Sequence, residues 1–230
     1  MAIYLLIFFL GSSVASFLNV VARSVPLNQN WWLRRSACPN CKTILQPWQL
    51  IPVISYLVQN GQCMKCYVKI SLSYLMVEIA GGILFTLPLL LPPSTRLQAW
   101  LFLLLLITVT LTDLYYRLVP NKILTAFGFL LFLLQPQIVS ALTGFLFFYG
   151  TAILGRLLWR KETIGGGDIK LYFVIGLVLP IQSLLLSIVF ASGLALFYVL
   201  VNRHDKKQEI PFVPFIAAGS LLSYLLMIIS

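Results

Sequence analysis

Two aspartates lie at the edges of long apolar segments, where an ionisable side chain is costly and is therefore a candidate for function. Asp113 closes the apolar run 97–112, and Asp168 stands just before a second run. Three glycines directly precede the second aspartate: Gly165, Gly166 and Gly167. Because each glycine costs a helix about 1 kcal/mol relative to alanine, they predict a break, where backbone can approach backbone or a substrate can approach both. A helix N-terminus with an acid in its first turn is the alternative interpretation.

Two carboxylates that face each other cannot both ionise cheaply, so they tend to share one proton and titrate as a pair. One then acts as a general base on water while the other, protonated, polarises a carbonyl, as in an aspartic protease. The apolar runs after the two aspartates, 123–134 and 171–179, are short. Short helices would thin the membrane locally and admit the water that hydrolysis consumes.

The four cysteines form a second constellation, arranged as two CxxC pairs: Cys38 with Cys41, and Cys63 with Cys66. Two such pairs at this separation predict a tetrahedral four-cysteine zinc site. The alternative is two disulfides, which would require an oxidising compartment. We expect apolar residues between the pairs to form a small core that the bound metal stabilises. These residues are Trp48, Leu50, Ile51, Val53, Ile54, Tyr56 and Leu57.

The composition says which kind of protein must position these residues. The chain is 60% hydrophobic and 10% charged, with a mean hydropathy of +0.96, whereas soluble domains carry about 25% charged residues. This indicates a polytopic membrane protein embedded in a lipid bilayer. Its 16 Lys and Arg residues against 6 Asp and Glu would suggest nucleic acid in a soluble protein. Here they indicate basic loops facing anionic lipid, with no nucleic-acid partner.

The apolar runs predict an all-α fold with about eight transmembrane helices. The run 171–201 is too long for one span and too short for two full spans, and Pro180 offers a turn within it. Splitting the run there leaves Arg96 alone on one side of the membrane and the other 15 of the 16 Lys and Arg residues on the opposite side. The positive-inside rule makes that basic side cytoplasmic.

This topology has three consequences. Both termini lie outside the cell, and both aspartates lie at the cytoplasmic face of the inner or cytoplasmic membrane. The cysteine loop is cytoplasmic and therefore reduced, which favours zinc over disulfides. The chain then divides into a first transmembrane helix (1–22), which lacks the basic start of a cleaved signal, a zinc-binding loop domain (23–70) and a seven-helix membrane domain (71–230).

Two further polar residues lie inside predicted spans. Burying Glu78 among apolar neighbours costs free energy unless its side chain is protonated, paired or turned to a polar cavity. Both a structural pairing and a supporting role at the site remain as interpretations. Asn19 lies near the end of the first span. We expect it to bond a neighbouring helix or to sit in the headgroup layer, as part of the packing.

Motifs along nearly the whole chain match one family. They are Ser16-Phe17-Leu18-Asn19-Val20-Val21, the two CxxC pairs, Pro52-Val53-Ile54-Ser55-Tyr56-Leu57, Tyr74 leading to Glu78, Asp113 with Pro120-Asn121, Gly165-Gly166-Gly167-Asp168-Ile169-Lys170-Leu171, and Pro211-Phe212-Val213-Pro214-Phe215. With these, the chain resembles the type IV prepilin peptidases, bacterial membrane aspartic proteases of the GxGD type. It departs from the family pattern at Ala15, where Gly is usual, and at Arg23, one place early.

The resemblance implies an aspartic endopeptidase that removes the short basic leader of prepilins or pseudopilins at the cytoplasmic face, for pilus assembly, secretion or DNA uptake. Asp113 and Asp168 would be catalytic. Substrate-binding or supporting roles would fall to Gly165, Gly166, Gly167, Lys170, Glu78 and Asn19. Zinc would be structural. Some members also N-methylate the new N-terminus with S-adenosylmethionine, an activity associated with the cysteine loop.

Other functions remain as alternatives. A GxGD intramembrane protease for other substrates shares the two aspartates but would not need a four-cysteine loop. A proton-coupled transporter would use Glu78, Asp113 and Asp168 as a relay, but a relay places acids along the membrane depth, whereas both aspartates are expected at one face. A zinc-stabilised scaffold without catalysis would leave the two aspartate motifs unexplained.

Overall fold

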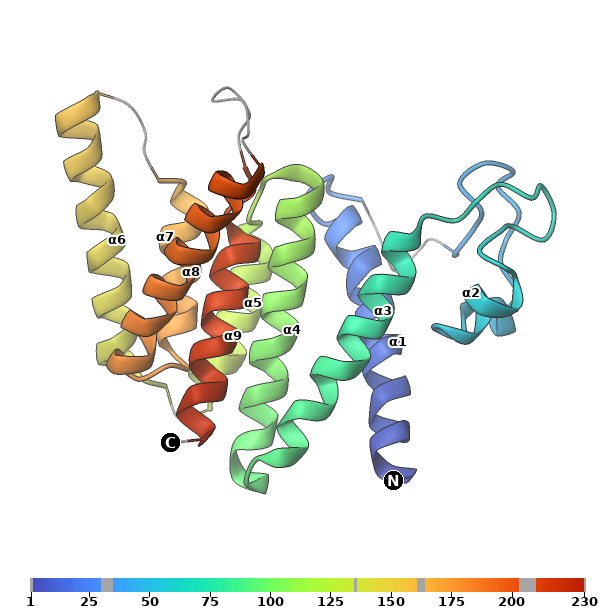
Figure 1. Cartoon of the computed structure of the whole chain (residues 1–230), viewed down its shortest axis with the longest axis horizontal. Helices are drawn as coiled ribbons and strands as arrows, with labels where there is room; N and C mark the ends of the chain where they lie inside the picture. Colours follow the sequence, from blue (N-terminus) through green and yellow to red (C-terminus); the bar gives the residue numbers. More distant parts are fainter. Residues whose placement is uncertain (1, 30–34, 135, 161–163, 203–209, 230) are drawn as a thin grey trace. The chain divides into compact units, whose positions relative to one another are not determined.

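The computed structural model describes residues 2–29, 35–134, 136–160, 164–202 and 210–229 of the chain and is built from helices (Figure 1). This described part contains no strand, only two isolated β-bridges, Ala37 to Ile44 and Gln62 to Lys69. The chain separates into two compact units, Met1–Arg96 and Leu97–Ser230. The boundary differs from the three sequence segments because α3 (Leu72–Thr86) packs on α1 (Ala2–Ser24).

Unit 1, Met1–Arg96, is organised by the crossing of α1 and α3. The two helices meet through small residues, since a side chain at Gly81 would overlap Ala15 and one at Gly11 would overlap Phe85. Small residues let helix backbones approach closely, which is how helices associate in a bilayer. The segment between the helices carries the 3-10 turn η1 (Pro47–Leu50) and α2 (Ile54–Val58), and η2 (Leu87–Leu90) follows α3.

Unit 2, Leu97–Ser230, contains the remaining helices. They are α4 (Pro93–Tyr116, which begins just before the boundary), α5 (Asn121–Phe132), α6 (Ile138–Trp159), α7 (Gly166–Gly176), α8 (Ile181–Asn202) and α9 (Val213–Ile229). The closest pairings are α8 with α9 and α6 with α7, and α5 also contacts α7. At the first of these crossings a Cβ added to Gly219 would lie 2.6 Å from the backbone nitrogen of Ala191.

The described helices confirm the predicted all-α membrane fold. Five of them are long and apolar enough to cross a membrane, namely α1, α3 extended by η2, α4, α6 and α8. Two shorter apolar helices, α5 and α9, and the short α7 complete a set that agrees with the predicted number of about eight. The predicted break at Pro180 is present, because α7 ends at Gly176 and α8 begins at Ile181.

The structure defines the two helix ends that carry the aspartates. The apolar run 97–112 ends at Asp113, but the helix does not: α4 continues to Tyr116, so Asp113 lies inside its last turn. For the three glycines two interpretations were open, a break in regular structure and a helix N-terminus with an acid in its first turn, and the structure has the second. Only Gly165 is outside the helix, as the N-cap of α7, while Gly166 and Gly167 are helical.

Candidate functional site

Asp113 is positioned by the end of α4 and the start of α9. The helix α4 ends at Tyr116, and the next residue, Arg117, adopts a left-handed conformation (φ 52°) and donates its N–H to the Asp113 carbonyl at 2.8 Å. The Asp113 side chain is buried, and its Oδ2 accepts the backbone N–H of Val213 at 3.0 Å. One oxygen of the carboxylate is therefore held by a backbone hydrogen bond, which restricts the side chain to one orientation.

Asp168 lies in the first turn of α7, where the helix dipole favours a negative charge. Its side chain is half-buried, and its Oδ2 turns back toward Gly165. The neighbouring Gly167 explains how this turn approaches the segment after α4, since a Cβ at that position would lie 2.9 Å from the Val119 Cβ. Of the three glycines, Gly167 is thus the one whose missing side chain a close contact requires.

The fold brings the two aspartates to one end of unit 2. The last turn of α4, which carries Asp113, and the first turn of α7, which carries Asp168, lie at the same end of the helices (Figure 1). Among the described residues, no side chain or backbone N–H bonds the Asp168 carboxylate. The two carboxylates therefore differ: Asp113 accepts a backbone hydrogen bond, and Asp168 accepts none from the described residues.

Glu78 has a different environment, in unit 1. Its Oε1 accepts the Ser16 hydroxyl of α1 at 2.8 Å, and its Oε2 accepts the backbone N–H of Val53 at 2.8 Å. Both oxygens of this carboxylate are engaged, one by a helix and one by the loop between the cysteine pairs. Of the two roles considered for Glu78, the observed contacts are those of a structural pairing.

The partner of Glu78 in the loop is strained. Val53 has φ 63° and ψ −54°, and the next N–H, of Ile54, bonds the Pro52 carbonyl at 2.6 Å. This is a γ-turn with positive φ, which is rare and costly for a β-branched residue. Such a conformation persists only where the surroundings hold it, and the bond to Glu78 is one such restraint.

Asn19 and Lys170 occupy contrasting positions. Asn19 is 2% exposed within the crossing of unit 1, in keeping with the packing role expected for it. Lys170 is exposed on α7 and donates to the Asn121 Oδ1 at 3.0 Å. It lies two residues after Asp168, about 200° around the helix axis, so the two side chains leave α7 on opposite faces.

The four cysteines come together in unit 1. Their sulfurs all lie within 4.8 Å of one another, with Cys38 and Cys66 at 3.8 Å and Cys41 and Cys63 at 3.9 Å. All four are free thiols, and these separations are far longer than a disulfide of about 2.05 Å. Sulfurs about 2.3 Å from a tetrahedral ion are about 3.8 Å apart, so the donor set fits zinc.

The two cysteine pairs have matching backbones. In each, the N–H of the first cysteine donates across a tight turn, from Cys38 to the Thr43 carbonyl and from Cys63 to the Val68 carbonyl. The residue after each pair, Lys42 or Tyr67, is left-handed. A hydrogen bond with the Thr43 hydroxyl also lowers the pKa of the Cys41 thiol to about 6, and the thiolate is the form that binds metal.

The prediction of a small hydrophobic core between the cysteine pairs is wrong. Trp48 is 45% exposed and Leu57 is 61% exposed, and Leu50, Ile51 and Ile54 are exposed as well. The turn η1 and the helix α2 are too short to enclose side chains between them. The segment is instead anchored through its backbone, by Val53 on Glu78.

Two functional contacts had no signal in the residue types. The Val213 N–H that holds Asp113 is a backbone group, although the surrounding motif 211–215 did mark the segment. The left-handed Val53 is a residue type that ordinarily avoids this conformation. Only its place next to Pro52, in a motif already singled out, could have drawn attention to it.

Comparison with protein families assigns both halves of the chain. Residues 9–91 match the bacterial peptidase A24 N-terminal domain, and residues 100–200 match the type IV leader peptidase family. The first match covers α1 from residue 9 onward, the cysteine loop and α3, and the second covers both aspartates.

Curated relatives agree along almost the whole chain. A prepilin leader peptidase/N-methyltransferase of Bacillus subtilis is 36% identical, covering 96% of this chain and 93% of that protein. Proteins of the same name from Burkholderia pseudomallei and Neisseria gonorrhoeae are 29% and 28% identical, covering 91% and 89% of this chain and 81% and 84% of their own lengths. No solved structure gives a significant match. The chain therefore belongs to the type IV leader peptidase family.

Proposed function

We propose that the chain is an aspartic endopeptidase that removes the short basic leader of prepilins or pseudopilins, with Asp113 and Asp168 as its catalytic pair. The observation that carries the proposal is that the last turn of α4, with Asp113, and the first turn of α7, with Asp168, lie at the same end of unit 2 (Figure 1). The names of the relatives supply the substrate class. An intramembrane protease of another kind would leave the matched N-terminal domain without a role.

The pair can perform hydrolysis with balanced proton transfers. One carboxylate takes a proton from water as the water oxygen bonds to the scissile carbonyl carbon, and the protonated partner donates to the carbonyl oxygen. The tetrahedral intermediate then collapses and the C–N bond breaks. The carboxylate that took the proton from water donates it to the leaving amine. The Val213 N–H keeps Asp113 in one orientation during these steps. No donor among the described residues bonds the Asp168 carboxylate, so its oxygens are available as acceptors for water in this proposal.

Zinc, bound by the four cysteines, has a structural role in this proposal, since a closed shell of four thiolates leaves no position for a substrate. The cysteine loop would be held at one end by the metal and at the other by the bond between Val53 and Glu78. N-methylation of the new N-terminus from S-adenosylmethionine is a second activity that the relatives' names support.

The proposed location is the bacterial cytoplasmic membrane, with both termini outside and with the cysteine loop and aspartates at the cytoplasmic face. The distribution of basic residues supports this orientation. A cysteine introduced at Arg96 should react with an impermeant thiol reagent added to intact cells, whereas one at Lys122 should not, after subtraction of the signal of the parent protein. Reaction at position 122 from outside would overturn the orientation.

Incubation of the purified full-length protein with a candidate prepilin tests the activity. Mass spectrometry of the product should show loss of the basic leader at one bond, and a further gain of one methyl group if S-adenosylmethionine is supplied and used. An uncut prepilin in the presence of folded enzyme would contradict the proposed function.

A further inference from the structure

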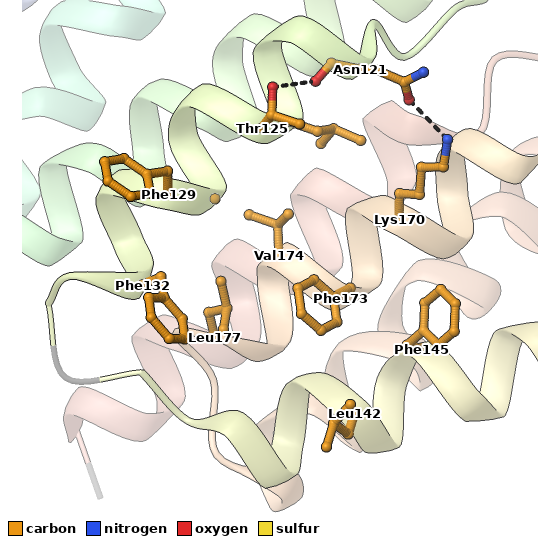
Figure 2. A pocket seen from close by; sticks show the side chains of 12 residues that line it. Asn121, Thr125, Phe129, Phe132, Leu142, Phe145, Lys170, Phe173, Val174 and Leu177 are labelled. Atoms are coloured by element: carbon orange, nitrogen blue, oxygen red, sulfur yellow. Dashed lines mark hydrogen bonds between the residues drawn. The ribbon is translucent and has the colours of Figure 1, made fainter.

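An open groove runs along the face of α7 turned away from Asp168. It has a volume of about 650 Å³ and lies among α5, α6 and α7 (Figure 2). The α5 side of the groove repeats at helical spacing, with Leu124, Gly128 and Phe132 among its residues. Apart from Asn121, Thr125 and Lys170, the lining is apolar.

The mouth of the groove is polar and cationic. Lys170 donates to the Asn121 Oδ1 at 3.0 Å across the gap between α7 and α5 (Figure 2). An ammonium has three N–H donors, and Asn121 accepts one of them. The exposed Lys122 follows Asn121 in the sequence and adds a second positive charge at this end of α5. Asp168, the nearest acid in sequence, leaves α7 on the opposite face.

We propose that this groove binds an anionic phospholipid, with one acyl chain along α5 and α7 and the phosphate at Lys170. The groove extends about 16 Å along α5, from its first residue to its last, which suits a chain lying parallel to the helix. Basic pockets between membrane helices are a recurring type of site for anionic headgroups. Because α5 and α7 are too short to span the hydrocarbon core, a bound chain would fill space beside them.

An apolar helix of the substrate is the other class of occupant. The position of the groove favours lipid, since Lys170 and Val174 face it whereas Asp168 points away from it. A peptide bond placed at the two aspartates would lie on the far side of α7 from the groove.

Photocrosslinking tests the proposal on the full-length protein in phosphatidylcholine nanodiscs. The probes are phosphatidylglycerol with a diazirine in one acyl chain and the matching phosphatidylcholine, and labelled peptides are identified by mass spectrometry. Peptides of α5 and α7 should be labelled about fivefold more by the phosphatidylglycerol probe, the effect of one lysine near an anionic lipid. Lys170→Gln should remove that preference, while Lys69→Gln, the same charge change at an exposed lysine of unit 1, should keep it.

Filling the groove provides an independent arm. A Cβ at Gly128 would lie 3.4 Å from Val174, so Gly128→Leu directs a side chain into the groove and should lower labelling by both probes several-fold. Gly150→Leu, where a Cβ meets no atom within 4 Å, should leave labelling unchanged. Equal labelling by the two probes that Lys170→Gln does not alter would overturn the proposal. Displacement of the label by an equimolar prepilin would overturn it in favour of a substrate site.

Discussion

Unit 1 and unit 2 each place carboxylates among apolar helices, but they satisfy them differently. In unit 1 both oxygens of Glu78 accept hydrogen bonds, from Ser16 and from Val53. In unit 2 Asp113 accepts one bond, from Val213, and within the described residues the Asp168 carboxylate accepts none. A hydrogen bond to a charged group contributes about 1.5 to 3 kcal/mol, so the first arrangement stabilises the fold while the second leaves acceptors for a reaction.

The comparison shows how the hydrogen-bond partners of an ionisable residue in a membrane helix indicate its role. Cost alone marks all three acids as candidates. The number of protein donors that reach each carboxylate then separates Glu78, which is bonded at both oxygens, from the two aspartates that we propose to be catalytic. Glu78 joins α1, α3 and the cysteine loop, whereas Asp168 joins no two elements by a hydrogen bond within the described residues.

The largest effect is expected from the aspartates. Asp113→Asn and Asp168→Asn should each lower prepilin cleavage by about 10²-fold to 10⁴-fold or more, because an amide can neither take a proton from water nor give one to the carbonyl. Both variants keep the shape of the side chain, so each should still insert and fold. Cleavage would be measured on equal amounts of membrane-inserted protein. Near-normal cleavage by either variant would remove the pair from the mechanism.

Loss of the metal should destabilise the folded structure of unit 1 rather than impair the cleavage reaction directly. Cys38→Ser should reduce bound zinc from about one ion per chain to none and lower the yield of folded protein, since four-cysteine zinc contributes about 10 kcal/mol or more to small domains. Met64→Ser, in the same loop and exposed, is the matched control. Metal analysis and gel filtration provide the measurements. Protein without zinc but with intact disulfides would show that the site is not a metal site.

The glycines before Asp168 sharpen the comparison within unit 2. Gly167→Ala places a Cβ 2.9 Å from the Val119 Cβ, so the first turn of α7 must shift and carry Asp168 with it. We expect cleavage to fall about 10-fold to 100-fold, as misplacement of a catalytic group by about 1 Å does. Gly166→Ala meets no atom within 4 Å and should cleave at nearly the normal rate. Equal cleavage rates for the two variants would show that the close contact between Gly167 and Val119 does not determine the position of Asp168.

The smallest effect on cleavage is expected at Glu78. Glu78→Gln keeps one acceptor oxygen but loses the charge, so unit 1 should be destabilised by about 1 to 3 kcal/mol and cleavage should fall only in part. Ser16→Ala removes a single donor and should cost less. Thermal unfolding in detergent would give the order of the two. A complete loss of cleavage in a folded Glu78→Gln protein would place this residue with the aspartates and end the contrast.

The sequence was sufficient for features that residue type and spacing encode. Hydropathy located the helices, the count of basic residues located the break at Pro180, and two CxxC pairs predicted the cysteine cluster. Family motifs identified the family that the comparisons show.

The remaining features depend on backbone geometry. Gly165, Gly166 and Gly167 look alike in the sequence, yet a Cβ would crowd a neighbour only at Gly167. The Val213 N–H on Asp113 is a main-chain donor that any residue except proline supplies. The exposed loop side chains escaped prediction because a hydrophobic residue type does not by itself say that a segment is long enough to bury it.

The cleavage rate of the double variant Asp113→Asn/Asp168→Asn tests the central claim most directly. Groups that act as one catalytic unit are strongly non-additive, so removing the second costs little once the first is gone. The double variant should therefore cleave prepilin at the same residual rate as the slower single variant. A loss equal to the product of the two single losses would mean that the two aspartates act independently, and would contradict the account of a shared catalytic pair.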